Sequence, residues 1–504
     1  MTSEKITITV DLKDAAATDQ LGEDLALALR VGDCLALSGD LGAGKSSLAR
    51  ALIRAMAEDE ALEVPSPTFT LIQSYDLRIP IAHFDLYRLS DASELDELGF
   101  DEALQNGICV VEWPEMGGDA LPADRIILRL EHQGSGRRAA IEAAGRQLER
   151  IQRVFSIRSF LTKAGYSEAN RRFLTGDASL RAYEAIYAKG QRMILMDWPP
   201  LKDGPAVLDG KPYPKVAHLA ENAYPFVAIA TELRARGFTA PAIYNVDYEK
   251  GILLVEDLGG NGVLDENGMP IEERYRAGIA CLAHLHALPF PRDITTGETH
   301  IHHIPDFDRT AMKMEVRLLV DWYLPWLRNG APVTDDERNA YLDIWDRLID
   351  RLETAEKNLL LRDYHSPNIL WQDHRQGIGR IGLIDFQDAM IGPTSYDVAS
   401  LVQDARVTID RRLSQVLMQD YLTLRRANAS FDEAAFMESW SIMAAQRNCK
   451  LVGIWVRLTQ RDGKSGYLRH MPRTLAYLKD TLNHPALAPL RNWCIQVGIE
   501  FNDV

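Results

Sequence analysis

The sequence predicts an α/β domain followed by a bilobal α+β domain with a small β-rich lobe and a large helical lobe. Two observations predict this order. Strand and helix patterns alternate up to about residue 130, which is typical of a layered α/β sheet. Beyond residue 180, a β-hairpin pattern precedes a long region whose apolar spacing is mostly helical.

Length and composition limit the class of protein. A chain of 504 residues is too long for one hydrophobic core, and 46% hydrophobic with 25% charged residues is typical of folded proteins. A net charge of −16 disfavours a broad basic nucleic-acid surface, so RNA would be met only through a partner. Five scattered cysteines without a CxxC pair suit a reducing compartment, and we find no apolar run long enough for a membrane span. We expect a cytoplasmic protein.

The elements of the first domain follow from apolar periodicity. A Gly-rich loop separates the third element from the fourth, and the pattern loses its apolar runs around residues 132–150. We therefore expect one domain over residues 1–150 and a second over residues 155–504. The expected elements are strand Ile6 to Val10, helix Asp19 to Leu29, strand Asp33 to Leu37, helix Ser46 to Met56, and strands Ile81 to Phe84, Ile108 to Val111 and Ile126 to Leu130.

The second domain divides into a small lobe over about 155–260 and a helical lobe over about 261–504. Two β-patterned runs between Leu180 and Trp198 flank a Gly-containing turn at Lys189-Gly190-Gln191, which predicts a hairpin. Thr334 and Glu337 have capping-box spacing and mark a helix start. The further expected elements are helices over 226–236, 271–286, 311–327 and 335–357, and a strand over 252–256.

The loop between the second strand and the second helix carries phosphate-binding chemistry. It satisfies G-x-x-x-x-G-K-[ST], in the strand-to-helix context that this motif requires. Its backbone N–H groups would surround the phosphates of ATP, the lysine would reach the β and γ phosphates, and the first serine would bind Mg²⁺. The candidate nucleotide-binding residues here are Gly39, Gly42, Gly44, Lys45, Ser46 and Ser47. This predicts a P-loop NTPase domain.

Four ordered motifs over about residues 5–150 resemble the TsaE family, the ATPase subunits of the bacterial tRNA threonylcarbamoyladenosine machinery. Besides the loop, these are Pro65 to Phe69, His83 to Arg88 and Val111 to Pro114. The resemblance implies an ATPase that works with the TsaB- and TsaD-like subunits of the threonylcarbamoyl-transferase complex and meets tRNA only indirectly. By motif position it assigns Mg²⁺ binding to Asp85, the attacking water to Glu112 and a γ-phosphate switch to Thr68.

The helical lobe contains a second group of residues typical of enzymes that act on phosphates. Asp363 and Asn368 lie five residues apart between apolar runs, as in the catalytic loop D-x-x-x-x-N, and Asp385 follows another apolar run. Phosphoryl transfer requires a base for the acceptor hydroxyl and metal ions between the phosphates. Asp363 is our candidate base, and Asn368 and Asp385 are our candidate Mg²⁺ ligands.

Residues from about 155 to 500 resemble the aminoglycoside phosphotransferase and choline kinase superfamily, which has a protein-kinase-like fold. Gly176 to Arg181 and Leu195 to Pro200 resemble its AmgK branch of cell-wall amino-sugar kinases. The resemblance implies ATP-dependent phosphorylation of the anomeric hydroxyl of N-acetylmuramate or N-acetylglucosamine in cell-wall recycling. It further implies a loop over the phosphates, Gly176 to Arg181, that contains Ser179 and Arg181. The interlobe segment Leu254 to Leu258, with Glu256 and Leu258, would meet adenine through its backbone.

One position departs from the wider kinase pattern. The second hairpin strand carries Met196 where most kinases have the phosphate-binding lysine. Arg181, Lys189 or Lys215 would then supply the cation. Two alternatives stay open for this half: an aminoglycoside or choline kinase, or an inactive domain that senses a ligand.

Overall fold

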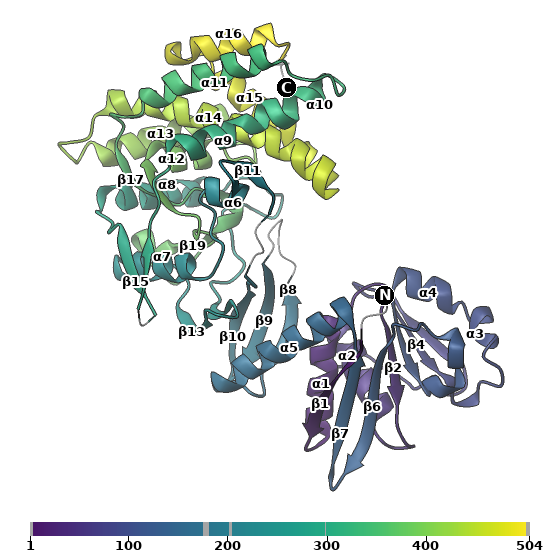
Figure 1. Ribbon diagram of the computed structural model, residues 1–504. Coiled ribbons are helices and arrows are strands. Elements are labelled where there is room, and N and C mark those ends of the chain that lie inside the picture. Colours follow the sequence, from purple (N-terminus) through teal and green to yellow (C-terminus); the bar gives the residue numbers. More distant parts are fainter. Residues whose placement is uncertain (1–3, 175–180, 201–203, 298, 500–504) are drawn as a thin grey trace. The chain divides into compact units, whose positions relative to one another are not determined.

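The computed structural model describes residues 4–174, 181–200, 204–297 and 299–499, and Figure 1 shows its ribbon. The chain forms two compact units, residues 1–197 and residues 198–504. In the first unit a seven-stranded sheet has the order β1-β7-β6-β2-β5-β4-β3. Its strands are β1 (Ile6–Leu12), β2 (Cys34–Ser38), β3 (Ile72–Tyr75), β4 (Ile81–Asp85), β5 (Ile108–Glu112), β6 (Ile126–Gln133) and β7 (Gly136–Ala143).

The central strands β6, β2, β5 and β4 run parallel, while β1, β7 and β3 pair antiparallel at the two sides. Strands β4 and β5 are buried along their whole length, and apart from His83 and the terminal acids Asp85 and Glu112 their residues are apolar. Because parallel strands end at one edge, the loops after β2, β4 and β5 meet there. That edge carries the first candidate site.

Helices α1 (Ala15–Ala28) and α2 (Lys45–Ala57) pack closely against each other. A Cβ atom on Gly22 would lie 2.8 Å from the Cβ of Ala51 and 2.9 Å from the carbonyl oxygen of Leu48. Only glycine permits this approach, which fixes the helix that begins at the phosphate-binding loop. Both helices were predicted, with ends that differ by a few residues.

The region over residues 132–150 differs from our expectation. It contains strand β7, which lies between β1 and β6, and the start of helix α5 (Gly145–Lys163), which continues past residue 150. In β7 only Ala139, Ile141 and Ala143 alternate inward, between arginines and a glutamate, so its apolar signal is weak. The boundary near residue 150 stays a prediction.

After α5 come three antiparallel strands, β8 (Asn170–Leu174), β9 (Ala182–Ala188) and β10 (Gln191–Asp197). The predicted hairpin is confirmed as β9 and β10, and its turn has positive φ at Lys189 and Gly190. Met196 is buried near the far end of β10 from this turn.

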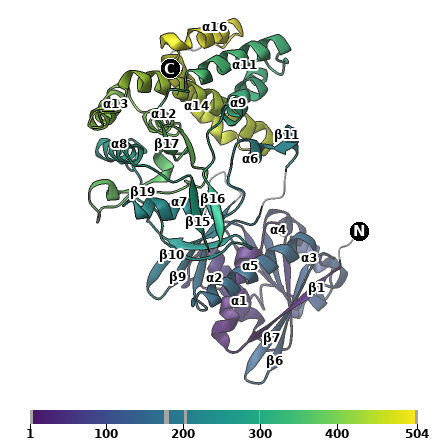
Figure 2. The ribbon, with the colours of Figure 1, turned by 60° about the vertical axis from the view of Figure 1, so that its left-hand side comes forward.

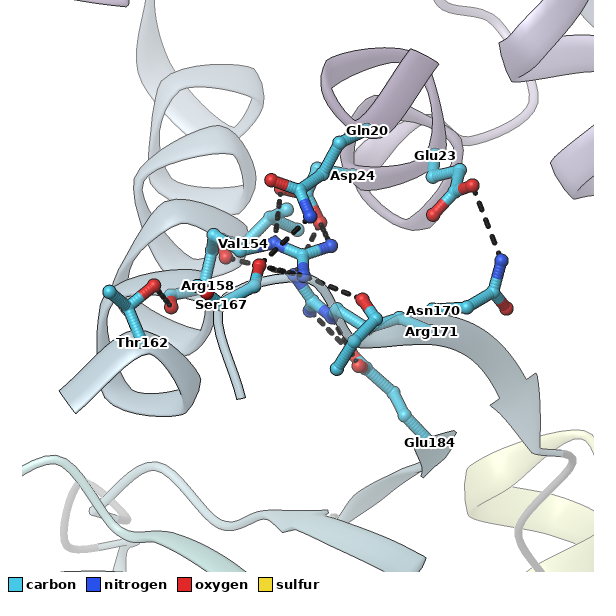
Figure 3. Close-up of polar contacts among 11 residues, drawn as sticks. Gln20, Glu23, Asp24, Val154, Arg158, Thr162, Ser167, Asn170, Arg171 and Glu184 are labelled. Atoms are coloured by element: carbon cyan, nitrogen blue, oxygen red, sulfur yellow. Dashed lines mark hydrogen bonds and ion pairs between the residues drawn. The ribbon is translucent and has the colours of Figure 1, made fainter. Parts of the chain in front are cut away.

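A buried ion-pair network joins α1 to α5, β8 and β9 (Figure 3). The Arg171 guanidinium donates to Asp24 at 2.8 Å and to both carboxylate oxygens of Glu184 at 2.7 and 2.8 Å. Arg158 of α5 also donates to Asp24, at 2.9 and 2.8 Å. The Arg171 side chain is 0% exposed, so its charge depends entirely on these partners.

The second unit is mainly helical, and Figure 2 shows the bundle from a second direction. Its central helix is α14 (Glu433–Asp462), which contacts α9 (Arg309–Leu318), α12 (Ser395–Val402) and α15 (Met471–Thr481). Gly453 of α14 lies so close to α9 that a Cβ atom would be 2.2 Å from the carbonyl oxygen of Leu318. The remaining longer helices are α7 (Tyr224–Ala235), α8 (Glu272–Ala287), α11 (Asp335–Asp350), α13 (Arg411–Arg425) and α16 (Ala488–Gln496).

Several predictions for this unit are confirmed. The capping box of Thr334 and Glu337 starts α11, and the predicted strand is β14 (Ile252–Glu256), paired with β13 (Ile243–Asp247). Helix α11 ends at Asp350, earlier than expected, and strand β17 (Lys357–Leu360) then leads into the predicted catalytic segment. All five cysteines are buried and unpaired. Within the described residues, no helix combines the length and apolarity needed to cross a membrane.

Candidate functional sites

The phosphate-binding loop connects β2 to α2, as its motif predicts. Gly39, Gly42 and Gly44 all have positive φ, of 136°, 79° and 109°. At Gly39 a Cβ atom would lie 2.3 Å from the carbonyl oxygen of Leu130, so a larger residue is excluded on two grounds. The loop conformation is thus built into the sequence by its glycines.

Lys45 turns back over this loop. Its ammonium group donates to the carbonyl oxygens of Gly39 at 2.6 Å and Asp40 at 3.0 Å, and lies 3.7 Å from the centre of the Trp113 ring. Burial lowers the pKa of Lys45, although Glu112 and other nearby acids favour its charged form. The present hydrogen-bond partners of the Lys45 ammonium are therefore neutral carbonyl oxygens. A charged phosphate oxygen would form a stronger, charge-assisted hydrogen bond with it.

The two predicted acids lie side by side. Asp85 at the end of β4 and Glu112 at the end of β5 are register partners on parallel strands. Glu112 accepts from the Ser46 hydroxyl at 2.8 Å and lies 3.0 Å from Nε2 of His83, while Asp85 accepts from Ser66 at 2.9 Å. Both carboxylates thus lie at the strand edge that carries the loop, with Glu112 directly beside the predicted metal ligand Ser46.

Two other predicted residues lie differently. Thr68 is half-buried in the loop before β3, two residues after Ser66, the partner of Asp85. Ser47 is exposed and lines a cavity of about 490 Å³ between α1, α2 and β8, together with Asp19 and Arg50. Its side chain therefore faces α1 and β8, so Ser47 would contact a nucleotide through its backbone N–H group.

The second site brings its three predicted residues together. Asn368 donates from its amide to the carbonyl oxygen of Asp363 at 3.0 Å and to the carboxylate of Asp385 at 3.4 Å. Asp385 has φ of 60° and also accepts from Gln387 at 3.0 Å. One amide side chain thereby connects the loop of the predicted base to the predicted metal-binding acid.

Buried acids hold this loop in place. Asp397, on α12, accepts from the backbone N–H groups of Leu361 at 2.5 Å and Arg362 at 2.9 Å, and burial raises its pKa to about 7. Burial alone would also raise the pKa of Asp363, but Lys450 and neighbouring arginines outweigh it and hold that pKa below its ordinary value. Asp363 is therefore ionised at neutral pH.

A cavity of about 180 Å³ opens beside Asp363. Its charged and polar lining comes mainly from α14 and from the loop of Asp363. It includes Tyr213, Arg362, Asp363, Arg447, Lys450 and Arg457.

The predicted adenine-binding residues are partly committed to other contacts. The carboxylate of Glu256 accepts from Arg234 at 3.2 Å and from the N–H of Ala242 at 3.0 Å, and the carbonyl oxygen of Leu258 accepts from Gln372 at 2.8 Å. These side-chain contacts of Glu256 are compatible with the expected adenine contact, which uses the main chain of this segment. Ser179 lies outside the described residues.

Comparisons with known proteins match the two halves separately. The family model "Threonylcarbamoyl adenosine biosynthesis protein TsaE" matches residues 12–140, and that of the "Phosphotransferase enzyme family" matches residues 170–435. The chain is 39% identical to the TsaE protein of Rickettsia felis, over 24% of this chain and 70% of that protein. It is 32% identical to the N-acetylmuramate/N-acetylglucosamine kinase of Caulobacter vibrioides, over 66% of this chain and 94% of that kinase. The chain belongs to both families.

These matches confirm the predicted fold classes of the two domains, a TsaE domain and a phosphotransferase domain. They also confirm that the chain is a fusion of the two. Both families are enzymes that use a nucleotide, and the second transfers phosphoryl groups. The sequence motifs did not indicate Arg137 of β7, which lies beside the phosphate-binding loop of the TsaE domain. The Nε atom of Arg137 lies 3.0 Å from the position that a Cβ atom on Gly44 would take. The motifs also did not indicate Arg447 and Lys450 in the phosphotransferase domain. None of these cations belongs to a local motif.

Proposed function

We propose that the chain is bifunctional. The TsaE domain hydrolyses ATP for the complex that forms N6-threonylcarbamoyladenosine in tRNA. The phosphotransferase domain transfers the γ-phosphoryl group of ATP to the 1-hydroxyl of N-acetylmuramate or N-acetylglucosamine. The observation that carries the second activity is the link from Asn368 to the main chain of Asp363 and to the carboxylate of Asp385, because it holds the loop of the predicted base beside the predicted metal ligands.

In the kinase reaction, the ionised carboxylate of Asp363 orients the acceptor hydroxyl and accepts its proton. The amide oxygen of Asn368 and the carboxylate of Asp385 are hard oxygen donors, which suits Mg²⁺. When bound, Mg²⁺ neutralises charge between the β and γ phosphates. Asp397 keeps the loop of Asp363 rigid through its two backbone hydrogen bonds.

A cation must also hold the α and β phosphates, since Met196 is apolar. Lys189 lies against the ring of Tyr166, with its ammonium 4.7 Å from the ring centre, at the opposite end of β10 from Met196. A seven-residue strand is about 20 Å long, so Lys189 is remote from that position. Arg181 or Lys215 is therefore our candidate.

In the ATPase reaction, Lys45 would exchange its carbonyl partners for the β and γ phosphates. Ser46 and Asp85 would hold Mg²⁺, and Glu112 would orient the attacking water. His83 supports this role because it fixes one oxygen of Glu112 and leaves the other toward Ser46.

A rival acceptor class is disfavoured by charge. Aminoglycosides and choline are cations, and they would meet Arg447, Lys450 and Arg457 in the cavity beside Asp363. The sensor alternative is disfavoured because all three catalytic positions are occupied by the expected side chains.

We propose that the TsaE domain occupies residues 1–150 and binds TsaB- and TsaD-like subunits of the threonylcarbamoyl-transferase complex, which bring the tRNA. The kinase domain would begin near residue 155. Both reactions consume ATP and the cysteines are unpaired, so we place them in the cytoplasm.

Two experiments test the halves separately. Purified protein with ATP and each amino sugar should yield the sugar 1-phosphate, identified by ³¹P NMR; a cationic acceptor preferred over both sugars would contradict the proposal. In a bacterial strain depleted of its own TsaE, the chain should restore threonylcarbamoyladenosine in tRNA, whereas Lys45→Ala should not. Equal modification by Lys45→Ala would contradict the ATPase role.

A further inference from the structure

The cavity beside Asp363 is unusually rich in positive charge. Arg362, Arg447, Lys450 and Arg457 line it, and Asp363 is the acid among its lining residues. Asp363 is engaged by the acceptor hydroxyl in the proposed reaction. The remaining question is which of the four cations are already neutralised by the protein.

Two of them share a buried acid behind the cavity. Glu315 of α9 is 0% exposed, pairs with Lys450 at 2.9 Å and forms a short contact with Arg362. It also accepts from Gln446 at 2.9 Å. Lys450 and Arg362 therefore belong to a closed structural network.

The other two are not neutralised in this way. Arg447 donates to the carbonyl oxygen of Gln403 at 3.3 Å, and Arg457 stacks over Tyr213 at 5.2 Å. Among the residues that the structure describes, no carboxylate lies within ion-pair distance of either guanidinium. The buried Nε of Arg457 has no hydrogen-bond partner there. Such a donor at a cavity is costly unless a ligand supplies an acceptor.

Both arginines lie on one face of α14. They are ten residues apart, which is about 15 Å along the helix, and Lys450 and Ile454 line the cavity between them. The cavity thus extends from Asp363 along a row of cations. An acceptor whose hydroxyl reaches Asp363 would present its other end to this row.

We propose that Arg457 binds a carboxylate of the acceptor, so that the kinase selects an acidic amino sugar over its neutral counterpart. This inference rests on the proposed kinase function. N-acetylmuramate and N-acetylglucosamine differ in one group, the lactyl ether with its carboxylate. A guanidinium forms an ion pair with charge-assisted hydrogen bonds to that carboxylate, whereas the hydroxyl that replaces it offers only a weaker, neutral acceptor.

The test compares kcat/KM for the two sugars. The wild-type protein should prefer N-acetylmuramate, and Arg457→Gln should lower its kcat/KM on the order of 10- to 100-fold, as expected for one charge-assisted pair. The value for N-acetylglucosamine and the KM for ATP should change less than about threefold. Arg457→Lys should recover part of the preference because it restores the charge.

Arg426→Gln is the matched control, because Arg426 is exposed and pairs with Glu433 of α14 at 2.6 Å, away from the cavity lining. It should leave both sugars unaffected. An equal loss for both sugars in Arg457→Gln, a raised KM for ATP, or no change would each overturn the inference while leaving the kinase function standing. If the wild-type protein phosphorylates neither sugar, the proposed function fails and this inference falls with it.

Discussion

Arg171 donates to Asp24 at 2.8 Å, and this buried contact joins the two family-matched regions of the chain. Asp24 lies within the TsaE match and Arg171 lies within the phosphotransferase match. A second acid, Glu184, binds the same guanidinium from β9. The first helix of the ATPase is therefore anchored to the strands that begin the kinase region.

Removing this charge should destabilise both regions. Arg171→Met leaves Asp24 and Glu184 buried with one cation fewer, and we expect a loss of about 3–5 kcal/mol in the free energy of unfolding of the first unit. Hydrogen exchange should quicken in α1 and β8 together. The exposed pair of Arg138 and Asp11 gives the control, since Arg138→Met should have no measurable effect. Exchange that quickens in β8 alone would contradict the anchoring.

In the ATPase site, we expect a substitution of Glu112 to impair ATP hydrolysis without impairing ATP binding. Glu112→Gln keeps the shape of the side chain but removes the charge that orients water, so the hydrolysis rate should fall about 10²- to 10⁴-fold. Binding of a fluorescent ATP analogue should persist, because Lys45 and the loop are intact. Glu97→Gln, an exposed acid of the same domain, should behave as wild type. Hydrolysis within a few-fold of wild type would exclude Glu112 as the water-orienting group.

For the kinase site, Asp363→Asn should reduce kcat by about 10²- to 10⁴-fold with little change in ATP affinity. The amide has no negative charge with which to accept the proton. Because the pKa of Asp363 is held below its ordinary value, the wild-type kcat should show no loss attributable to this group between pH 8 and pH 5. Asp343→Asn, on the exposed side of α11, serves as the control. A half-maximal kcat near pH 6 that disappears in Asp363→Asn would contradict this account.

Glu315 predicts a pH-dependent contribution to stability. Burial would raise its pKa, but Lys450 and Arg362 outweigh burial and lower the pKa from 4.5 to about 2. An acid with a lowered folded-state pKa stabilises above its unfolded pKa, and this contribution is lost as pH falls toward 2. Between pH 7 and pH 4, wild type should lose about 1 kcal/mol more than Glu315→Gln in urea unfolding. Surface Glu353→Gln should track wild type, and parallel losses in Glu315→Gln would refute the assignment.

Many residues of both candidate sites could be predicted from local sequence motifs. The glycines of residues 39–44 have the positive φ values that the loop motif requires, and Asp363, Asn368 and Asp385 converge as their spacing predicted. Strand β7 and helix α5 were missed, because alternating alanines between charged residues give little apolar periodicity.

The sequence by itself determined that the chain has two phosphate-handling motifs. Each motif depends on particular residue types at short, fixed spacings, either between a strand and a helix or within a loop. Tertiary structure alone decided what surrounds them. Arg447 and Arg457 reach the cavity of Asp363 only because α14 packs through the centre of the second unit. Likewise Asp24 meets Arg171 across 147 residues of chain. Contacts between distant segments leave no local spacing in a sequence, so the cations that surround Asp363 and the acids that neutralise some of them become visible only in the folded molecule.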